Sequence, residues 1–188
     1  PKLSDYWGDP FLLNDMDKAV ERIIQAMKNK EKIMIFWDYD VDGITSSYIL
    51  YKFFVKFLKY DNISIQYPDR LLDGYGMKKK HIDDIKAKNC TLIITVDNGI
   101  SAVEEAKYAR EQNIDMIITD HHQHGESIPD AFAVITPLIS PDYIFKWLAG
   151  VGVAFKLILA LTEKSNLTKE QKNRIFNYFL PVVAIGTV

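Results

Sequence analysis

The sequence predicts an α/β domain in which helices flank a mostly parallel β-sheet, with a helical C-terminal portion. Short β-branched apolar runs alternate with amphipathic segments of helical period along the first 135 residues. Strands that alternate with helices form right-handed crossovers, which make the sheet parallel. Beyond residue 135 the apolar spacing is helical. The 188 residues, 48% of them hydrophobic, suit one domain with a substantial core.

Each predicted strand is short, rich in β-branched residues and bounded by polar ones. The strands are residues 32–37, 63–67, 92–96, 116–119 and 133–135. Helices are expected where apolar residues recur at the spacing of one helix face. They are residues 17–29, 45–59, 78–88, 101–112, 152–163 and 168–179. The last of these opens on Thr168 and Gln171, which fit a capping box.

Bulk properties exclude several classes of protein. The formal net charge is −2, so any nucleic acid must be bound through a local groove, helped by metal ions, rather than through a basic surface. Cys90 is the only cysteine, which excludes an internal disulfide and an all-thiolate zinc site. No apolar run approaches the roughly 20 residues that span a bilayer. A free thiol and the lack of a signal-peptide pattern favour a cytoplasmic location.

Acidic residues and histidines follow three of the predicted strands directly. They are Asp38, Asp40 and Asp42 after the first strand, Asp97 after the third, and Asp120, His121 and His122 after the fourth. The carboxyl ends of parallel strands meet at one edge of a sheet, where open α/β sheets bind ligands. One such Asp alone is usually a turn former or a helix cap, but three sites together indicate a common purpose. His124 lacks this support and is expected at the surface.

Converging carboxylates repel one another unless a cation lies between them. Oxygen ligands joined by one or two imidazoles suit Mn²⁺ or Mg²⁺ better than structural zinc. A cluster of this size could hold two ions about 4 Å apart, which can activate a water and stabilise charge on phosphate oxygens. The sequence therefore predicts a metal-dependent site for phosphate chemistry.

Two other motifs share part of this pattern. Asp38, Asp40, Asp42 and Gly43 match the start of an EF-hand loop, but Ile49 occupies the twelfth position, where a bidentate Glu is needed. The preceding segment also has the pattern of a strand rather than a helix. The pair Asp38 and Asp40 resembles the nucleophile motif of haloacid-dehalogenase-type phosphatases, although Asp42 stands where these have Thr or Val. That family remains a minor alternative.

Taken together, the motifs resemble the DHH phosphoesterase superfamily and, within it, the RecJ-type single-strand-specific exonucleases. The matching segments are residues 9–16, 38–46, 70–76, 95–101, 120–122 and 149–155. Their order and spacing carry the resemblance, which covers nearly the whole chain. It implies a Rossmann-like DHH domain over residues 1–188, helical from about residue 145, without the family's C-terminal DHHA1-type domain.

The resemblance also implies roles for the strand-end residues. The positions that match metal ligands are Asp38, Asp40, Asp42, Asp97 and His121. His122 matches a histidine near the scissile phosphate, where it could stabilise charge or assist proton transfer, and with Asp97 it is the predicted catalytic residue. Asp120 is expected to support the structure or to orient an imidazole.

Four further residues are predicted to bind substrate. Arg70 matches a position that suits a phosphate contact, and Tyr75 could stack on a base or pack within its loop. Gly150 and Gly152 precede a predicted helix, whose first N–H groups would suit a phosphate. Close packing of that helix explains the two glycines equally well.

Two departures from the family pattern bear on the activity. Trp37 stands where RecJ proteins commonly have Gly, so a bulky ring must pack beside the site. Family members continue with Ala-Asp, a further metal ligand, after the position of Val188, where this sequence ends. Weak metal affinity and little activity are therefore expected of this fragment by itself.

The function implied by the resemblance is a Mn²⁺- or Mg²⁺-dependent phosphodiesterase, a 5′-to-3′ exonuclease on single-stranded DNA in repair and recombination. A single-strand-binding protein and a helicase are expected partners of the full-length protein. The alternatives are another DHH activity, on pyrophosphate, oligonucleotides or cyclic dinucleotides, and a non-catalytic nucleic-acid-binding scaffold.

Overall fold

Five parallel strands form one sheet at the centre of the structure, a computed structural model that describes residues 8–68, 74 and 76–188. The strands are β1 (Lys32–Trp37), β2 (Ile63–Gln66), β3 (Cys90–Val96), β4 (Asp115–Thr119) and β5 (Ala133–Ile135). Their order is β2-β1-β3-β4-β5, so the connections turn in opposite directions on either side of the β1–β3 boundary. Such a switch point opens a crevice at the carboxyl ends of the strands.

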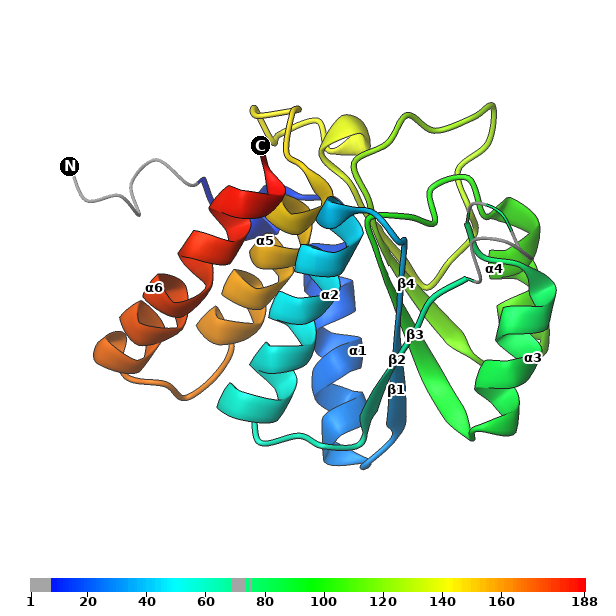
Figure 1. Cartoon of the computed structure of the whole chain (residues 1–188), viewed down its shortest axis with the longest axis horizontal. Coiled ribbons are helices and arrows are strands. Elements are labelled where there is room, and N and C mark those ends of the chain that lie inside the picture. The colour runs from blue at the N-terminus through cyan, green and yellow to red at the C-terminus, as the bar shows by residue number, and fades with distance from the viewer. Residues whose placement is uncertain (1–7, 69–73, 75) are drawn as a thin grey trace.

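Helices cover both faces of the sheet (Figure 1). They are α1 (Met16–Lys28), α2 (Val41–Lys52), α3 (Lys79–Ala87), α4 (Val103–Glu111), α5 (Gly150–Glu163) and α6 (Lys169–Gly186), with short turns η2 (Pro10–Leu12), η3 (Phe53–Phe57) and η4 (Pro137–Ile139). Helices α1, α2 and α5 lie on one face, with α6 packed outside α2 and α5. Helices α3 and α4 lie on the other face.

The strands are apolar because both of their faces are buried. Along β1, Ile33 and Ile35 point into the core shared with α1, α2 and α5, whereas Met34 and Phe36 point into the core beneath α3 and α4. Pairing in register brings Trp37 level with Val96, and Val96 level with Thr119. The residues that follow β1, β3 and β4 therefore emerge together.

The predicted fold class is confirmed, and every predicted strand and helix is present. Their bounds agree within a few residues except at the C-terminal ends of α2 and α6. Helix α2 begins at Val41 rather than at residue 45, because the Asp40 side chain accepts a hydrogen bond from Gly43 N and caps it. At Phe53 the helix changes to a π-helical turn. The α5 helix begins at Gly150, later than the expected start of the helical portion, and residues 140–149 form a loop.

Helix α6 runs seven residues beyond its predicted end, through Pro181 to Gly186. Its N-terminus has the predicted capping box, with Gln171 N 3.2 Å from Thr168 Oγ1 and Thr168 N 2.8 Å from Gln171 Oε1. Of the helices in the described part of the chain, none is long and apolar enough to cross a membrane.

Candidate metal centre

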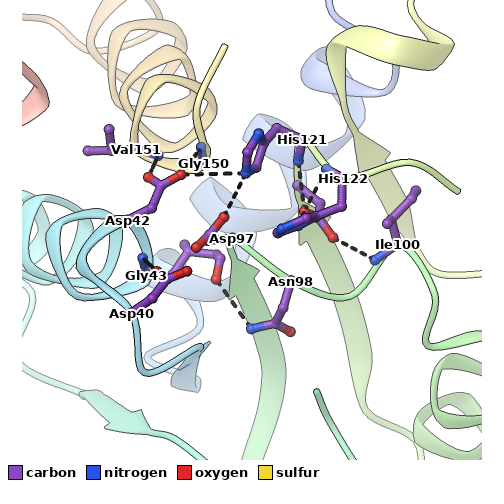
Figure 2. A network of polar contacts seen from close by, with 12 residues as sticks. Asp40, Asp42, Gly43, Asp97, Asn98, Ile100, His121, His122, Gly150 and Val151 are labelled. Carbon is purple, nitrogen blue, oxygen red and sulfur yellow. Dashed lines mark hydrogen bonds and ion pairs between the residues drawn. The ribbon is translucent and has the colours of Figure 1, made fainter. Parts of the chain in front are cut away.

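The three acidic motifs meet at the carboxyl edge of the sheet, at the β1–β3 switch point (Figure 2). His121, after β4, places its Nε2 atom 3.1 Å from Asp97 Oδ1, at the end of β3. The same nitrogen lies 3.5 Å from Asp42 Oδ2, in the first turn of α2. Residues from three separate strand ends are thus in direct contact, as the parallel arrangement predicts.

The first motif is held by its own backbone. Asp38 is buried, and its Oδ1 accepts a hydrogen bond from Tyr39 N at 2.8 Å. Burial raises the pKa of Asp38, against the effect of the Tyr39 N–H group, and the Asp40 carboxylate raises it further. Gly43 cannot carry a side chain here, because a Cβ atom would lie 2.3 Å from the carbonyl oxygen of Asp38. The tight turn therefore requires glycine at this position.

Asp42 joins this motif to a helix more than a hundred residues away. Its two carboxylate oxygens accept hydrogen bonds from Gly150 N and Val151 N, each at 2.7 Å. These are the first N–H groups of α5, and a helix N-terminus favours a negative charge. The N–H of Gly150 thus binds a carboxylate of the chain itself, a contact that no local sequence signal revealed.

Both glycines lie inside the first turn of α5 rather than before it. A Cβ atom on Gly150 would lie 2.4 Å from Asp97 Oδ1, whereas one on Gly152 would lie 3.1 Å from the side chain of Leu148. Close packing against the site therefore accounts for Gly150. A contact of either glycine with substrate stays a prediction.

Asp97 is deeply buried, with 1% of its surface exposed, and has a left-handed backbone (φ 58°). Its N–H donates to Thr119 O at 3.0 Å, which fixes the carboxylate above the strand ends. Neither carboxylate oxygen accepts a hydrogen bond of regular geometry from a described residue. Burial raises the pKa of Asp97 to about 7; contact with His121 opposes this shift, and Asp42 and Asp40 reinforce it. An ionised carboxylate in this position calls for a cation.

In the motif that follows β4, residues 120–122, Asp120 pairs with His122 rather than with His121. Asp120 Oδ1 lies 2.7 Å from His122 Nδ1 and accepts hydrogen bonds from the backbone N–H groups of both histidines, while Oδ2 accepts one from Ile100 N at 2.9 Å. Burial opposes ionisation of Asp120, but these donors hold its pKa below the usual value. The hydrogen bond to Asp120 in turn raises the pKa of His122 to about 9 against the effect of burial.

The structure brings together some predicted site residues more closely than others. Asp97, His121 and His122 each offer a ligand atom within 4.8 Å of the others, so His122, predicted as catalytic, is also placed to hold a metal. Arg70 and Tyr75 lie outside the described residues. Asp38 and Asp40 accept hydrogen bonds from backbone N–H groups of their own motif. Their role as metal ligands stays a prediction.

Trp37, at the end of β1, packs partly buried against the core beneath α2. Its ring centroid lies 5.3 Å from that of Tyr67, which is 60% exposed. The bulky ring is thus accommodated beside the first motif, on the side of the edge strand β2.

A cavity of about 810 Å³ opens beside His122. Its walls include Met77 and Lys78 before α3, and Ile100 and Ser101 before α4. Its volume lies in the range of small-molecule sites, so it has room for a nucleotide unit.

Replacing Asp120 by Asn is expected to lower the pKa of His122 from about 9 toward 6.5, because the carboxylate that stabilises the imidazolium is lost. A raised folded-state pKa contributes stability below pH 6.5, and that contribution disappears as the pH rises through about 9. Titration of the His122 ring by NMR in metal-free protein measures the shift. Asp130→Asn, which removes an exposed carboxylate paired with Arg110, should leave the titration unchanged. An unchanged His122 pKa in Asp120→Asn would contradict this account.

Comparison with known proteins identifies the family of this domain. The family model described as "DHH family, N-terminal domain" matches residues 32–187. The single-stranded-DNA-specific exonuclease RecJ of Bacillus subtilis (strain 168) is 42% identical over 189 residues, which cover 100% of this chain and 22% of that protein. RecJ of Escherichia coli (strain K12) is 39% identical over 182 residues, covering 94% of this chain and 31% of the relative. The chain thus spans less than a third of the length of these curated relatives.

Solved structures show the same fold. A crystal structure of exonuclease RecJ bound to manganese superposes with a TM-score of 0.81 at 29% identity, covering 93% of this chain and 43% of that one. RecJ from Thermus thermophilus in complex with Mn²⁺ gives a TM-score of 0.77 at 26% identity, covering 94% of this chain and 24% of that one. The profile match, the identities and the shared fold together show that this chain belongs to the DHH family, as an N-terminal DHH domain.

Proposed function

We propose that this domain is the catalytic part of a metal-dependent exonuclease that hydrolyses phosphodiester bonds of single-stranded DNA from the 5′ end, in repair and recombination. The observation that carries the proposal is the buried carboxylate of Asp97, which lacks regular hydrogen-bond donors and lies against His121 at the switch point. The similarity of this chain to RecJ exonucleases supports the proposal, as do two similar RecJ structures that contain manganese.

The residues present fit a divalent cation. Their donor atoms are carboxylate oxygens and imidazole nitrogens, which suit Mn²⁺ or Mg²⁺, and two ions are proposed for the full-length enzyme. The proposed ligands are Asp38, Asp40, Asp42, Asp97 and His121; His122 also offers a ligand atom, but only in its neutral form. When bound, such ions neutralise phosphate charge and lower the pKa of a water nucleophile.

Side chains of this domain are proposed to orient the substrate and to stabilise the negative charge on its phosphate. Asp120 holds the His122 ring through Nδ1, which orients the ring for contact with a phosphate oxygen at the cavity beside it. As an imidazolium, His122 would stabilise the charge that develops on phosphate or donate a proton to the leaving oxygen. Arg70 and Tyr75 are proposed to contact the strand, and Gly150 and Gly152 to lie beside it.

The proposal for the full-length protein also covers its cellular location and its protein partners. We also propose a cytoplasmic location, which the single free thiol at Cys90 and the expected substrate support. Contacts with a single-strand-binding protein and a helicase would follow from action on single strands during repair. These statements rest on the proposed activity.

The test uses the full-length protein with oligonucleotides labelled at either end, single-stranded and duplex, in Mn²⁺ or in EDTA. We expect mononucleotides to be released from the 5′ end of single strands in the presence of Mn²⁺ but not in EDTA, and duplex to stay intact. His121→Ala should lower kcat/KM by at least about 100-fold, because a ligand is lost, whereas His124→Ala should match the wild type. Cleavage of pyrophosphate or cyclic dinucleotides with single strands left intact would assign another DHH activity. If a calorimetric titration with Mn²⁺ detects no binding, the protein is instead a non-catalytic scaffold.

A further inference from the structure

The loop between η4 and α5 exposes an unusual amount of apolar surface. Ile144 is 92% exposed, Phe145 54% and Trp147 82%, which makes this short stretch the most exposed group of large apolar side chains inside the described chain. The loop rises above the carboxyl edge of the sheet, next to the start of α5 (Figure 1). Contiguous exposed apolar groups of this kind mark interaction sites.

The loop is anchored at its base although its rings are exposed. Lys146, between the two aromatic residues, turns inward and donates to the carbonyl oxygens of Pro137, at 3.1 Å, and Ser140. Tyr143 is buried, with 4% of its surface exposed. Side chains thus anchor the loop before the tip, at Tyr143, and within it, at Lys146, which reduces the conformational entropy lost when a ligand meets the rings.

The two rings lie close together, on the stretch of chain that leads into the metal centre. The centroids of Phe145 and Trp147 are 6.2 Å apart, with an interplanar angle of 71°. Trp147 precedes Gly150 by three residues, a stretch of chain that spans at most about 11 Å. Gly150 N binds Asp42 at 2.7 Å, so the Cα atom of Trp147 lies within about 11 Å of a residue that contacts the site.

We propose that Phe145 and Trp147 form a stacking platform for bases of the single strand whose backbone is held at the metal centre; this rests on the proposed function. Lys146 is turned inward, so residues 144–147 expose apolar and aromatic side chains rather than a charged group, which suits bases rather than phosphates. Stacking tolerates any base, as an enzyme that degrades a strand of any sequence requires. Continuity with the phosphate site favours nucleic acid over another polypeptide as the occupant.

The first experiment compares Trp147→Ala and Trp147→Phe in the full-length protein. Loss of one stacked base should raise KM for oligothymidylate by about 5- to 100-fold and leave kcat unchanged, whereas Phe should keep most of the affinity. The same oligonucleotide with abasic sites at its first positions should bind wild type and Trp147→Ala equally. A purely structural role of Trp147 cannot produce this dependence on the bases.

Two outcomes overturn the platform. One is an unchanged KM in Trp147→Ala. The other is a loss of thermal stability together with an equal loss of affinity for normal and abasic strands, which would show that polypeptide covers the loop. Binding does not need catalysis, so quenching of tryptophan emission by oligothymidylate in metal-free protein, present in the wild type and reduced in Trp147→Phe, tests the platform separately. If quenching is seen and hydrolysis is not, the proposed function fails and the platform stands.

Discussion

Replacing Asp97 by Asn is expected to abolish hydrolysis by the full-length protein and, at the same time, to stabilise the metal-free domain. Hydrolysis is lost because an amide is a poor ligand for Mn²⁺ or Mg²⁺ compared with a carboxylate. Stability rises because Asn removes an ionised group that is 1% exposed and lacks regular hydrogen-bond donors. Thermal unfolding in EDTA and a single-strand degradation assay in Mn²⁺ measure the two effects.

The stability gain depends on pH in a defined direction. The pKa of Asp97 is raised from 3.8 to about 7, so its ionisation destabilises the metal-free fold, by about 4 kcal/mol at most, above pH 7. The penalty shrinks as the pH falls from 7 toward 4, because the folded protein then carries a neutral acid. Wild type and Asp97→Asn should therefore differ most near pH 8 and converge near pH 4.

Asp120→Asn is the matched control, because Asp120 is equally buried but fully paired. This variant should lose stability, since an amide group would face backbone N–H donors that now bind a carboxylate. Mn²⁺ should raise the unfolding temperature of the wild type by mass action and have a much smaller effect on Asp97→Asn. A metal-free Asp97→Asn that is less stable than the wild type at pH 8 would contradict the proposed metal centre.

The sequence was sufficient to predict the fold and the convergence of the acids. Apolar runs with β-branched residues predicted β1, β3 and β4, and the parallel topology then required their carboxyl ends to meet. The start of α2 was harder to predict from the sequence, because Asp40 is both a predicted metal ligand and the residue that caps the helix. Side-chain identity alone does not show that one residue serves two purposes.

Contacts between distant segments could not be predicted. The hydrogen bonds from Gly150 and Val151 to Asp42 depend on how α5 packs against α2, which local patterns do not encode. The choice of His122 as the partner of Asp120 depends on how the chain turns after β4. Helix α6 continues past Pro181 because packing against α2 and α5 outweighs the local cost of proline.

Gly150→Ala is expected to lower Mn²⁺ affinity and kcat/KM by about 100-fold or more, whereas Gly152→Ala, two residues along the same helix, should leave Mn²⁺ affinity nearly unchanged. An alanine methyl at position 150 would lie 2.4 Å from Asp97 Oδ1 and 2.7 Å from its Cβ and Cγ atoms, so the carboxylate must leave its place beside His121. Metal ligands tolerate little displacement before affinity is lost. Calorimetry with Mn²⁺ and the single-strand assay report the two losses in the full-length protein.

The contrast between the two glycines separates geometry from helix propensity. Both lie in the first turn of α5, and each substitution should gain roughly 0.5–1 kcal/mol of intrinsic helix stability. At position 152 the three atoms nearest to the methyl would all belong to the Leu148 side chain, and the closest of them, Cδ2 at 3.1 Å, can move aside. Equal Mn²⁺ affinity of the two variants would show that Asp97 need not stay where the structure places it. A defect confined to Gly150→Ala, with its helix content intact, would instead show that α5 controls the metal centre through the position of a single carboxylate.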